Sequence, residues 1–293
     1  MSGSPGRALD EFSALQRVVV QHARDAFRDR TYVARWWREL GFLAPPDPER
    51  AGAESDRLVA LLEEDGAEVM RLPPADGVGI DSIYVRDASV ESPRGVVLAS
   101  MAKPGRRGEP AAQRATFEAW GIPVAGEIRE PGHLEGGDVV WFDAETVAVG
   151  RGYRTDDEGI RQFRGIVGAA VEVVVVPLAH WHGPGDVFHL MSIVSPLDRD
   201  LALVYAPLLP VPFREWLLAR GIELVEVPAE EFDSMGANVL ATAPRRAIAL
   251  AGNPETRRRL ERAGVEVREL VGAEISLKGG GGPTCLTRPL DRR

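Results

Sequence analysis

Cysteine is nearly absent from this chain of 293 residues, which contains one, Cys285. A disulfide framework within the chain and a zinc site built mainly from cysteines are therefore excluded. Positive charge is also in short supply, because 35 Lys and Arg stand against 44 Asp and Glu and the net charge is −9. This balance argues against a protein that binds nucleic acid or anionic lipid through bulk charge, whereas a small cationic substrate is compatible with it.

Long hydrophobic runs are missing as well. The longest, residues 171–178, is interrupted by Glu172 and is far shorter than the roughly 18 residues of a membrane-spanning helix. Residues 1–7 are mostly Gly, Ser and Pro with no apolar stretch behind them, which does not fit a secretory signal. With 44% hydrophobic and 27% charged residues, the composition predicts a cytoplasmic, globular protein with a core.

One unit recurs five times along the chain: a helix-like stretch, a glycine and an apolar run rich in β-forming residues. Each glycine suits the left-handed conformation that ends a helix. The glycines are Gly66, Gly121, Gly168, Gly221 and Gly264, and the helices predicted before them cover residues 55–65, 109–120, 156–166, 211–220 and 254–263. Strands are predicted between the units at residues 83–85, 95–99, 138–142, 147–150, 201–205, 238–241 and 247–250. The pattern predicts α/β repeats, arranged either as blades around an axis or as one parallel sheet.

The first fifty residues follow a different pattern. Residues 11–20 predict an opening strand, residues 24–40 a helix, and residues 45–53 a proline-rich, charged connector. No strong domain boundary follows them. We therefore expect residues 1–293 to form a single domain, with residues 1–50 packed on it.

The lone cysteine lies in an unusual setting. Cys285 comes shortly after four consecutive glycines, residues 279–282, which disfavour a regular element and let a ligand approach the backbone closely. A single cysteine is more often a small buried side chain than a nucleophile. A nucleophilic thiol also needs a proton partner, and the histidines available are His22, His133, His180, His182 and His189.

The segment 180–189 has three interpretations. In a metal-dependent hydrolase, His180 and His182 would share one face of a strand, and Asp186 or His189 would complete the site. Alternatively, His189 alone exchanges protons with Cys285. A purely structural role is the third possibility, and these residues do not decide among them.

Two acidic motifs are equally open to more than one interpretation. Glu135 and Asp138 flank a glycine pair just before an apolar run, which suits a tight turn that faces a ligand, or an ordinary polar turn. Arg86 and Asp87 close the predicted strand 83–85, where they could line the mouth of a site or form a surface ion pair.

Taken in order, five segments resemble the guanidine-modifying (pentein) enzymes, which include arginine deiminases, dimethylarginine dimethylaminohydrolases and amidinotransferases. The segments are 134–139 (LEGGDV), 153–155 (YRT), 188–190 (FHL), 236–240 (GANVL) and 281–286 (GGPTCL). The resemblance covers about residues 60–290. It implies a five-bladed α/β propeller of ββαβ-type repeats around a central active site, in agreement with the five units, and catalysis by a cysteine without metal or cofactor.

The resemblance also implies roles for individual residues. Cys285 would attack the guanidinium carbon. His189 would protonate the departing amine and then deprotonate water, and Glu135 would orient His189. Asp87 would hold the guanidinium through hydrogen bonds, and Asp138 would support that wall of the site.

A second group of residues would recognise the amino-acid end of the substrate. Arg106 and Arg154 would bind the α-carboxylate, with Arg107 as a competing candidate for the first of these positions. Asp81 would receive the α-ammonium, and the ring of Tyr84 would flank the substrate. The implied partner is therefore a small guanidino amino acid.

Departures from the family pattern bear on the substrate. Met191 stands where deiminases and amidinotransferases carry an aspartate, and a thioether suits methyl groups better than N–H donors. Together with Asp81 in place of Asn and the short chain, this favours the aminohydrolase branch. Segment 281–286 and residues 198–200 read more like a deiminase, although Gly280 stands where deiminases often have an arginine.

The predicted reaction is hydrolysis of an Nω-methylated L-arginine to L-citrulline and methylamine or dimethylamine, through a covalent thiouronium intermediate. The alternatives are an arginine deiminase that releases ammonia, an amidinotransferase that needs an amine acceptor, a His-based metal-dependent hydrolase, and a binding protein without catalysis.

Overall fold

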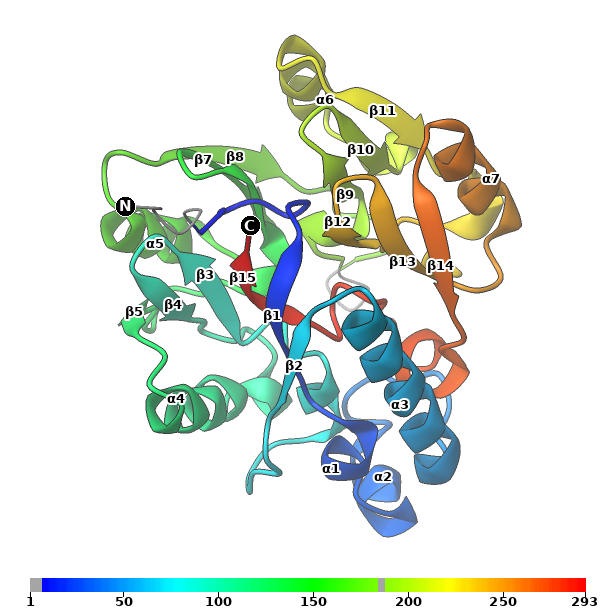
Figure 1. The fold of residues 1–293 in the computed structure, drawn as a ribbon. Helices are drawn as coiled ribbons and strands as arrows, with labels where there is room; N and C mark the ends of the chain where they lie inside the picture. Colours follow the sequence, from blue (N-terminus) through cyan, green and yellow to red (C-terminus); the bar gives the residue numbers. More distant parts are fainter. Residues whose placement is uncertain (1–6, 184–187) are drawn as a thin grey trace, which may run out of the picture.

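Five three-stranded sheets surround a common centre in the computed structural model, which describes residues 7–183 and 188–293 (Figure 1). The strands are β1 (Leu15–Val20), β2 (Glu68–Arg71), β3 (Ser89–Ser92), β4 (Gly95–Leu98), β5 (Val124–Glu127), β6 (Val139–Asp143), β7 (Thr146–Arg151), β8 (Glu172–Pro177), β9 (Val194–Asp198), β10 (Leu201–Val204), β11 (Glu223–Glu226), β12 (Leu240–Ala243), β13 (Arg246–Leu250), β14 (Glu266–Leu270) and β15 (Arg288–Arg292). The propeller alternative of the repeat prediction is confirmed.

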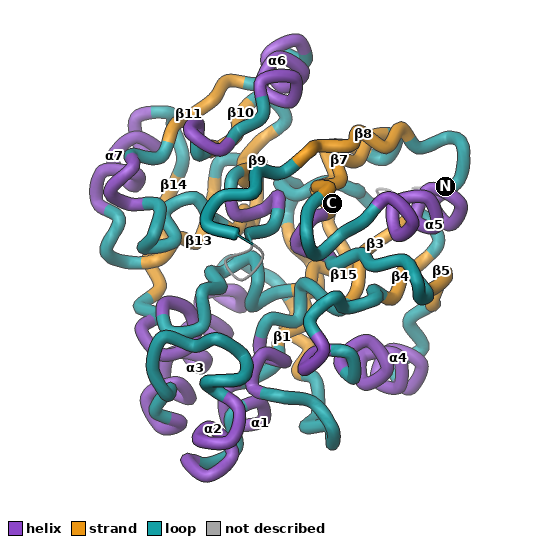
Figure 2. The backbone as a smooth tube through the Cα atoms, turned by 180° about the vertical axis from the view of Figure 1, so that it is seen from behind, coloured by secondary structure: helices purple, strands orange, loops and turns teal. Residues whose placement is uncertain are grey.

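All five sheets share one topology. The middle strand pairs antiparallel with one neighbour and parallel with the other, and the parallel partner follows after a helical crossover. The helices are α1 (Ala23–Ala26), α2 (Arg30–Trp36), α3 (Pro48–Glu64), α4 (Glu109–Ala119), α5 (Asp157–Val167), α6 (Val211–Ala219) and α7 (Pro254–Arg262). Seen from behind, the longer helices, among them α3, α4, α6 and α7, lie at the periphery of the molecule (Figure 2).

The ends of the chain close the ring. Four sheets are built from consecutive strands, but the remaining sheet has the order β15-β1-β2, so the last strand of the chain pairs with the first. The pairing is antiparallel and joins Val18 to Pro289 and Val19 to Arg288. The position of the segment that precedes β15, residues 279–287, therefore depends on pairing between the first and last strands of the sequence.

The five glycines end their helices as predicted. Gly66, Gly121, Gly168, Gly221 and Gly264 all have positive φ angles, between 69° and 94°. Side chains with a Cβ rarely adopt this conformation, so glycine allows the chain to leave each crossover helix and enter the next strand.

Two predictions for the first fifty residues were wrong. The helix expected over residues 24–40 is divided into α1 and α2, because Arg28 has a φ of 56° and Asp29 caps the second helix by accepting a hydrogen bond from the Tyr32 amide. The connector expected over residues 45–53 ends early, since Asp47 caps α3 and Pro48 occupies its first turn.

The strand predicted at residues 83–85 was also wrong. Residues Ile80–Ile83 form a 3₁₀ turn, and the strand of that sheet begins at Ser89. The backbone groups here bond elsewhere: the Tyr84 carbonyl accepts from the Arg106 guanidinium, and the Arg86 amide donates to the Cys285 carbonyl. The apolar residues are buried, but they form part of a site instead of a sheet.

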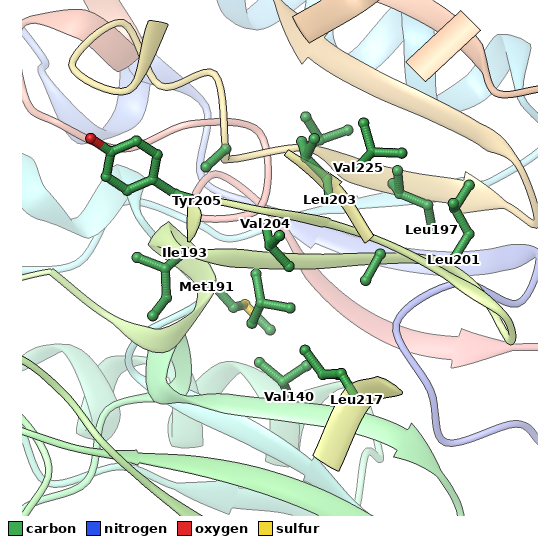
Figure 3. Packing of buried hydrophobic residues seen from close by; sticks show 14 of the residues in the cluster. Val140, Met191, Ile193, Leu197, Leu201, Leu203, Val204, Tyr205, Leu217 and Val225 are labelled. Atoms are coloured by element: carbon green, nitrogen blue, oxygen red, sulfur yellow. The ribbon is translucent and has the colours of Figure 1, made fainter. Parts of the chain in front are cut away.

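The largest apolar cluster lies between neighbouring sheets and includes Val140 of β6, Met191, Val204 of β10 and Leu217 of α6 (Figure 3). Its aliphatic side chains come from elements far apart in sequence, which ties the blades to one another. In the described part of the chain, every helix is too short or too polar to cross a membrane.

Candidate active site

One chemically important residue precedes the first strand of each sheet. Asp87 lies before β3, Glu135 before β6, His189 before β9, Asn238 before β12 and Cys285 before β15. Because the five sheets are arranged around one centre, the segments that enter them converge there. This explains how residues almost 200 positions apart in sequence become neighbours.

His189 and Glu135 form an ion pair at this centre. His189 Nε2 lies 2.9 Å from Glu135 Oε2, and His189 Nδ1 lies 3.7 Å from Asp87 Oδ1. Burial alone would lower the pKa of His189, but the charges of Asp87, Asp138 and Glu135 outweigh it and raise the pKa to about 9. The imidazole is therefore cationic at neutral pH, as a general acid for an amine leaving group must be.

Glu135 is held by more than the histidine. Its Oε1 accepts a hydrogen bond of 3.0 Å from the Ala102 amide, and its Oε2 accepts one of 3.1 Å from Arg154 Nη1. Burial would raise the pKa of this carboxyl, but the hydrogen bond from His189 and the charge of Arg154 lower it instead. Glu135 therefore stays ionised and fixes the orientation of the imidazole.

Asp138 links the turn of Glu135 to the segment of His189. Its two oxygens accept hydrogen bonds from Thr155 Oγ1 at 2.7 Å and from the Leu190 amide at 2.9 Å. Burial raises the pKa of Asp138 to about 6, against the opposing charge of His189. These contacts place Asp138 behind the His189 segment, where it supports the site.

Asp87 offers a free acceptor toward the histidine. Its Oδ2 accepts a 2.6 Å hydrogen bond from Arg106 Nη1, whereas no donor among the described residues reaches its buried Oδ1. Burial opposes ionisation, yet the charges of His189 and Arg106 lower the pKa of Asp87 to about 2. A side chain at Gly137 would fill the adjacent space, because its Cβ would lie 2.7 Å from both Asp87 Oδ1 and His189 Nδ1.

The partners of Arg106 differ from the α-carboxylate that the resemblance implies. Arg106 is 3% exposed, and its Nε and Nη2 donate to the two oxygens of Glu109 at 2.9 and 2.8 Å, while Nη1 serves Asp87. Burial raises the pKa of Glu109 to about 7, although Arg106 opposes the shift. The alternative, Arg107, is exposed and pairs with Glu130 at 3.6 Å.

Cys285 lies beside Asp87 on the neighbouring segment and is partly exposed. Its Sγ accepts a 3.3 Å hydrogen bond from Asn238 Nδ2, and Asn238 Oδ1 in turn accepts from the amide and hydroxyl of Thr284. Burial and the negative charge of Asp87 raise the pKa of the thiol, partly offset by Asn238. In the ligand-free site the thiol is therefore protonated, and a bound cation would favour the thiolate.

The glycine run before Cys285 makes room for its neighbours. A Cβ at Gly281 would lie 2.4 Å from Tyr84 Cε1 and 3.1 Å from Cys285 Cβ, and one at Gly282 would lie 2.5 Å from Asn238 Oδ1. The buried Tyr84 ring stacks on Phe42 at a centroid distance of 6.3 Å. The glycines thus let the tyrosine and the asparagine pack directly against the thiol segment.

Three further residues of the predicted site have defined places. Asp81 Oδ2 lies 2.7 Å from Lys103 Nζ. Arg154 is 21% exposed at its side chain and bonds Glu135. Met191 is 3% exposed and packs in the core beside Val140 (Figure 3), so its thioether belongs to the apolar cluster described above.

The metal interpretation of segment 180–189 loses its structural basis. Strand β8 ends at Pro177, so His180 and His182 do not share a strand face, and His180 Nδ1 lies 2.5 Å from the Tyr153 hydroxyl. Asp186 lies outside the described residues. The described side chains that approach one another closely enough for an ion are Asp87, Glu135 and His189, which already form the ion pairs given above.

Asn238 lies in the GANVL motif, but the sequence alone predicted no role for it. Its signal is positional, because it stands before β12 as the other four stand before their strands. Arg106 and Glu109 carry a second overlooked signal, the i, i+3 spacing of opposite charges.

Comparisons with known proteins show which family the chain is similar to. Residues 47–292 match the model of a family described as N,N dimethylarginine dimethylhydrolase, eukaryotic. An uncharacterised protein of Bacillus subtilis, YkgA, is 31% identical over 242 residues, which are 83% of this chain and 80% of that protein. The arginine deiminase of Listeria welshimeri is 28% identical over 71% of this chain, and the chain spans 61% of its length.

Solved structures agree on the fold. A variant of dimethylarginine dimethylaminohydrolase from Pseudomonas aeruginosa, complexed with citrulline, superposes with a TM-score of 0.74 at 23% identity and covers 94% of this chain and 98% of its own. The N-terminal domain of ArgZ, a cyanobacterial arginine dihydrolase bound to product, gives 0.80 at 24% identity and covers 94% and 97%. The propeller architecture is thereby confirmed.

Proposed function

The chain belongs to the N,N-dimethylarginine dimethylhydrolase family and is an amidine-hydrolysing C–N hydrolase, and we propose that it converts an Nω-methylated L-arginine to L-citrulline and methylamine or dimethylamine. Membership of the family makes the protein a hydrolase of guanidino groups. To this we add the methylated substrate and the roles of the individual residues.

The first half of the proposed reaction forms a covalent adduct. Binding of the guanidinium beside Asp87 stabilises the thiolate of Cys285, whose proton is released to solvent. The sulfur adds to the guanidinium carbon, and the C–N bond to the methylated nitrogen breaks as His189 donates its proton to the departing amine. The product of this half is a thiouronium group on Cys285.

The second half regenerates the enzyme. His189, now neutral, accepts a proton from a water molecule that adds to the thiouronium carbon. The C–S bond then breaks, which gives the ureido group of citrulline and returns the thiolate. The 2.9 Å contact with Glu135 keeps the imidazole in place for both proton transfers and stabilises its cationic form.

One observation carries the choice of a methylated substrate: few carboxylate oxygens remain to receive guanidinium N–H groups. Asp87 Oδ1 accepts no hydrogen bond from the described residues, whereas both oxygens of Glu135 already accept hydrogen bonds, and position 191 holds a buried methionine. An N–H group buried without an acceptor costs about 1–3 kcal/mol, and a methyl group needs no acceptor. The lack of a carboxylate at position 191 is sufficient for this preference, and no contact between the substrate and the Met191 thioether is needed.

An arginine deiminase is the second candidate, favoured by the similarity to the Listeria enzyme. A substrate panel distinguishes the two. Nω-methyl- and Nω,Nω-dimethyl-L-arginine, L-arginine and agmatine are each incubated with the protein, and citrulline, methylamines and ammonia are measured separately. Higher kcat/KM for L-arginine than for both methylated forms would replace the proposal by the deiminase.

The covalent step has its own test. A haloacetamidine should alkylate Cys285, as mapped by mass spectrometry of peptides, and L-citrulline should slow the labelling. Replacing Cys285 by Ser should abolish turnover while ligand binding persists. Absence of label on a folded protein would indicate a site without a reactive thiol.

A further inference from the structure

The segment that carries Asp87 is held in place without being part of a sheet. Residues 84–87 lie between a 3₁₀ turn and β3, and each of their four carbonyl groups accepts a hydrogen bond from a different part of the chain. In chain order, the donors are Arg106 Nη2 at 3.1 Å, Gln113 Nε2 at 2.9 Å, Arg288 Nη2, and the Gly136 amide at 2.8 Å. Three of these donors are side chains, so the position of Asp87 depends on residues far from it in sequence.

Gln113 is the uncharged side chain among these donors. It lies in the second turn of α4 and is 4% exposed. Its Nε2 donates to the carbonyl of Val85, two residues before Asp87. Its Oε1 is buried and receives no hydrogen bond from the described residues. The amide group of Gln113 is therefore used through its donor side alone.

This one-sided use adds little to the stability of the fold. A buried acceptor without a donor costs free energy, and an apolar side chain of similar size contains no such atom. Replacing Gln113 by Met would leave the Val85 carbonyl without its donor, but it would also remove the unpaired Oε1, and the two effects oppose each other. What Gln113 provides is a fixed position for the Val85 carbonyl.

The position of Asp87 affects the proton affinity of His189. Asp87 Oδ1 lies 3.7 Å from His189 Nδ1, and its charge is the largest of those that raise the pKa of the histidine, ahead of Asp138 and Glu135. At an effective dielectric constant of about 20, moving Asp87 about 1 Å away would lower this pKa by roughly 0.5 to 1 unit. The pKa of His189 therefore reports a displacement of Asp87.

We propose that Gln113 is a positioning residue, which holds the Val85 carbonyl and thereby keeps Asp87 at the distance from His189 that guanidinium binding and proton transfer require. This role rests on the proposed function and extends the machinery to a helix outside the five sequence motifs. It requires no contact between Gln113 and the substrate, since the side chain acts through the backbone of residues 85–87.

The test compares Gln113→Met with Gln162→Met. Gln162 of α5 is a matched control, because its Nε2 also donates to a backbone carbonyl at 2.9 Å, that of the exposed Arg129. Gln113→Met should lower kcat/KM about 10- to 100-fold and lower the pKa of His189 in an NMR titration by about 0.5 unit or more. Its melting temperature should stay within about 3 °C of the parent. Gln162→Met should leave kcat/KM and the pKa of His189 unchanged.

A purely structural role would lower the melting temperature and leave the other two quantities unchanged. An unchanged kcat/KM or an unchanged pKa of His189 in folded Gln113→Met would therefore overturn the proposal. If this variant does not fold, Gln113→Leu replaces it, and failure of both to fold would also overturn the proposal, in favour of the structural role.

The proposed substrate is tested separately from the role of Gln113. Variant and parent are compared on the same substrate, so a preference for L-arginine would contradict the methylated substrate without changing the ratio of their kcat/KM values. The titration of His189 needs no substrate at all, and it decides on Gln113 even if the parent turns over neither compound.

Discussion

Replacing Glu135 by Gln should lower the pKa of His189 and thereby remove its proton near neutral pH. The elevation from the ordinary 6.5 to about 9 corresponds to about 3 kcal/mol, supplied by Asp87, Asp138 and Glu135 against the cost of burial. Glu135 makes the closest contact of the three, 2.9 Å from Nε2. Its neutralisation also leaves the charge of Arg154 uncompensated, so we expect the pKa to fall by at least about one unit.

NMR titration of the protein labelled with ¹³C in its histidines measures this directly, with the His189 signal assigned from a His189→Gln variant. The unsubstituted protein should titrate near pH 9, the Glu135→Gln variant at least about one unit lower, and a Glu130→Gln control, which removes an exposed carboxylate, as the parent does. Turnover of Glu135→Gln should fall about 100-fold or more. A titration midpoint near 6.5 in the parent would refute the electrostatic argument.

The same shift makes stability depend on pH. Because the pKa of His189 is raised in the folded protein, the stabilisation is complete below the unfolded value of about 6.5 and disappears as the pH rises through about 9. The difference in unfolding free energy between parent and Glu135→Gln should therefore be larger at pH 6 than at pH 10. Denaturant melts at both pH values measure it, and an equal difference would contradict the assignment.

Two substitutions test the packing around the site. Gly281→Ala places a Cβ 2.4 Å from Tyr84 Cε1, which should destabilise the fold by about 1–3 kcal/mol and reduce turnover. The control is Gly165→Ala, whose Cβ would meet no described atom within 4 Å and which should leave the thermal melting temperature unchanged. Equal melting temperatures for the two variants would refute the steric clash at Gly281. Arg106→Met leaves the buried Asp87 and Glu109 without their shared cation, which should destabilise the fold by about 3–5 kcal/mol in urea melts at pH 8, and a loss below 1 kcal/mol would contradict its buried ion pairs.

The secondary structure could be predicted where a backbone conformation strongly favours one type of residue. The helix ends were placed correctly because a positive φ strongly favours glycine, and each repeat uses one. Residues 83–85 were predicted to form a strand because they are apolar and β-forming, and the structure does bury them. Burial does not distinguish a strand from a turn, and here Tyr84 and Arg86 use their backbone groups in bonds to Arg106 and Cys285.

The ordered motifs predicted most residues of the candidate site. The partners of the remaining residues depend on contacts that no motif encodes. The neighbours of Cys285, His189 and Glu135 follow from the repeat architecture once the sheets surround one centre. The pairing of Arg106 with Glu109 could not be predicted in this way, because an arginine near acidic residues can bind either those residues or a ligand. Its burial is decided by three-dimensional packing of α4 and the turn before β3.

The placement of Cys285 before β15 ties the reactive thiol to closure of the ring. Strand β15 is held to β1 by pairing between the two ends of the chain, whereas the first strands of the other four sheets are joined to their partners by short connections. Ends held without a covalent link open more readily than strands within a hairpin. The backbone amides of β15 should therefore exchange with deuterated solvent at a lower urea concentration than that at which helical circular dichroism is lost. Coincident transitions would show that the ring opens only when the whole molecule unfolds.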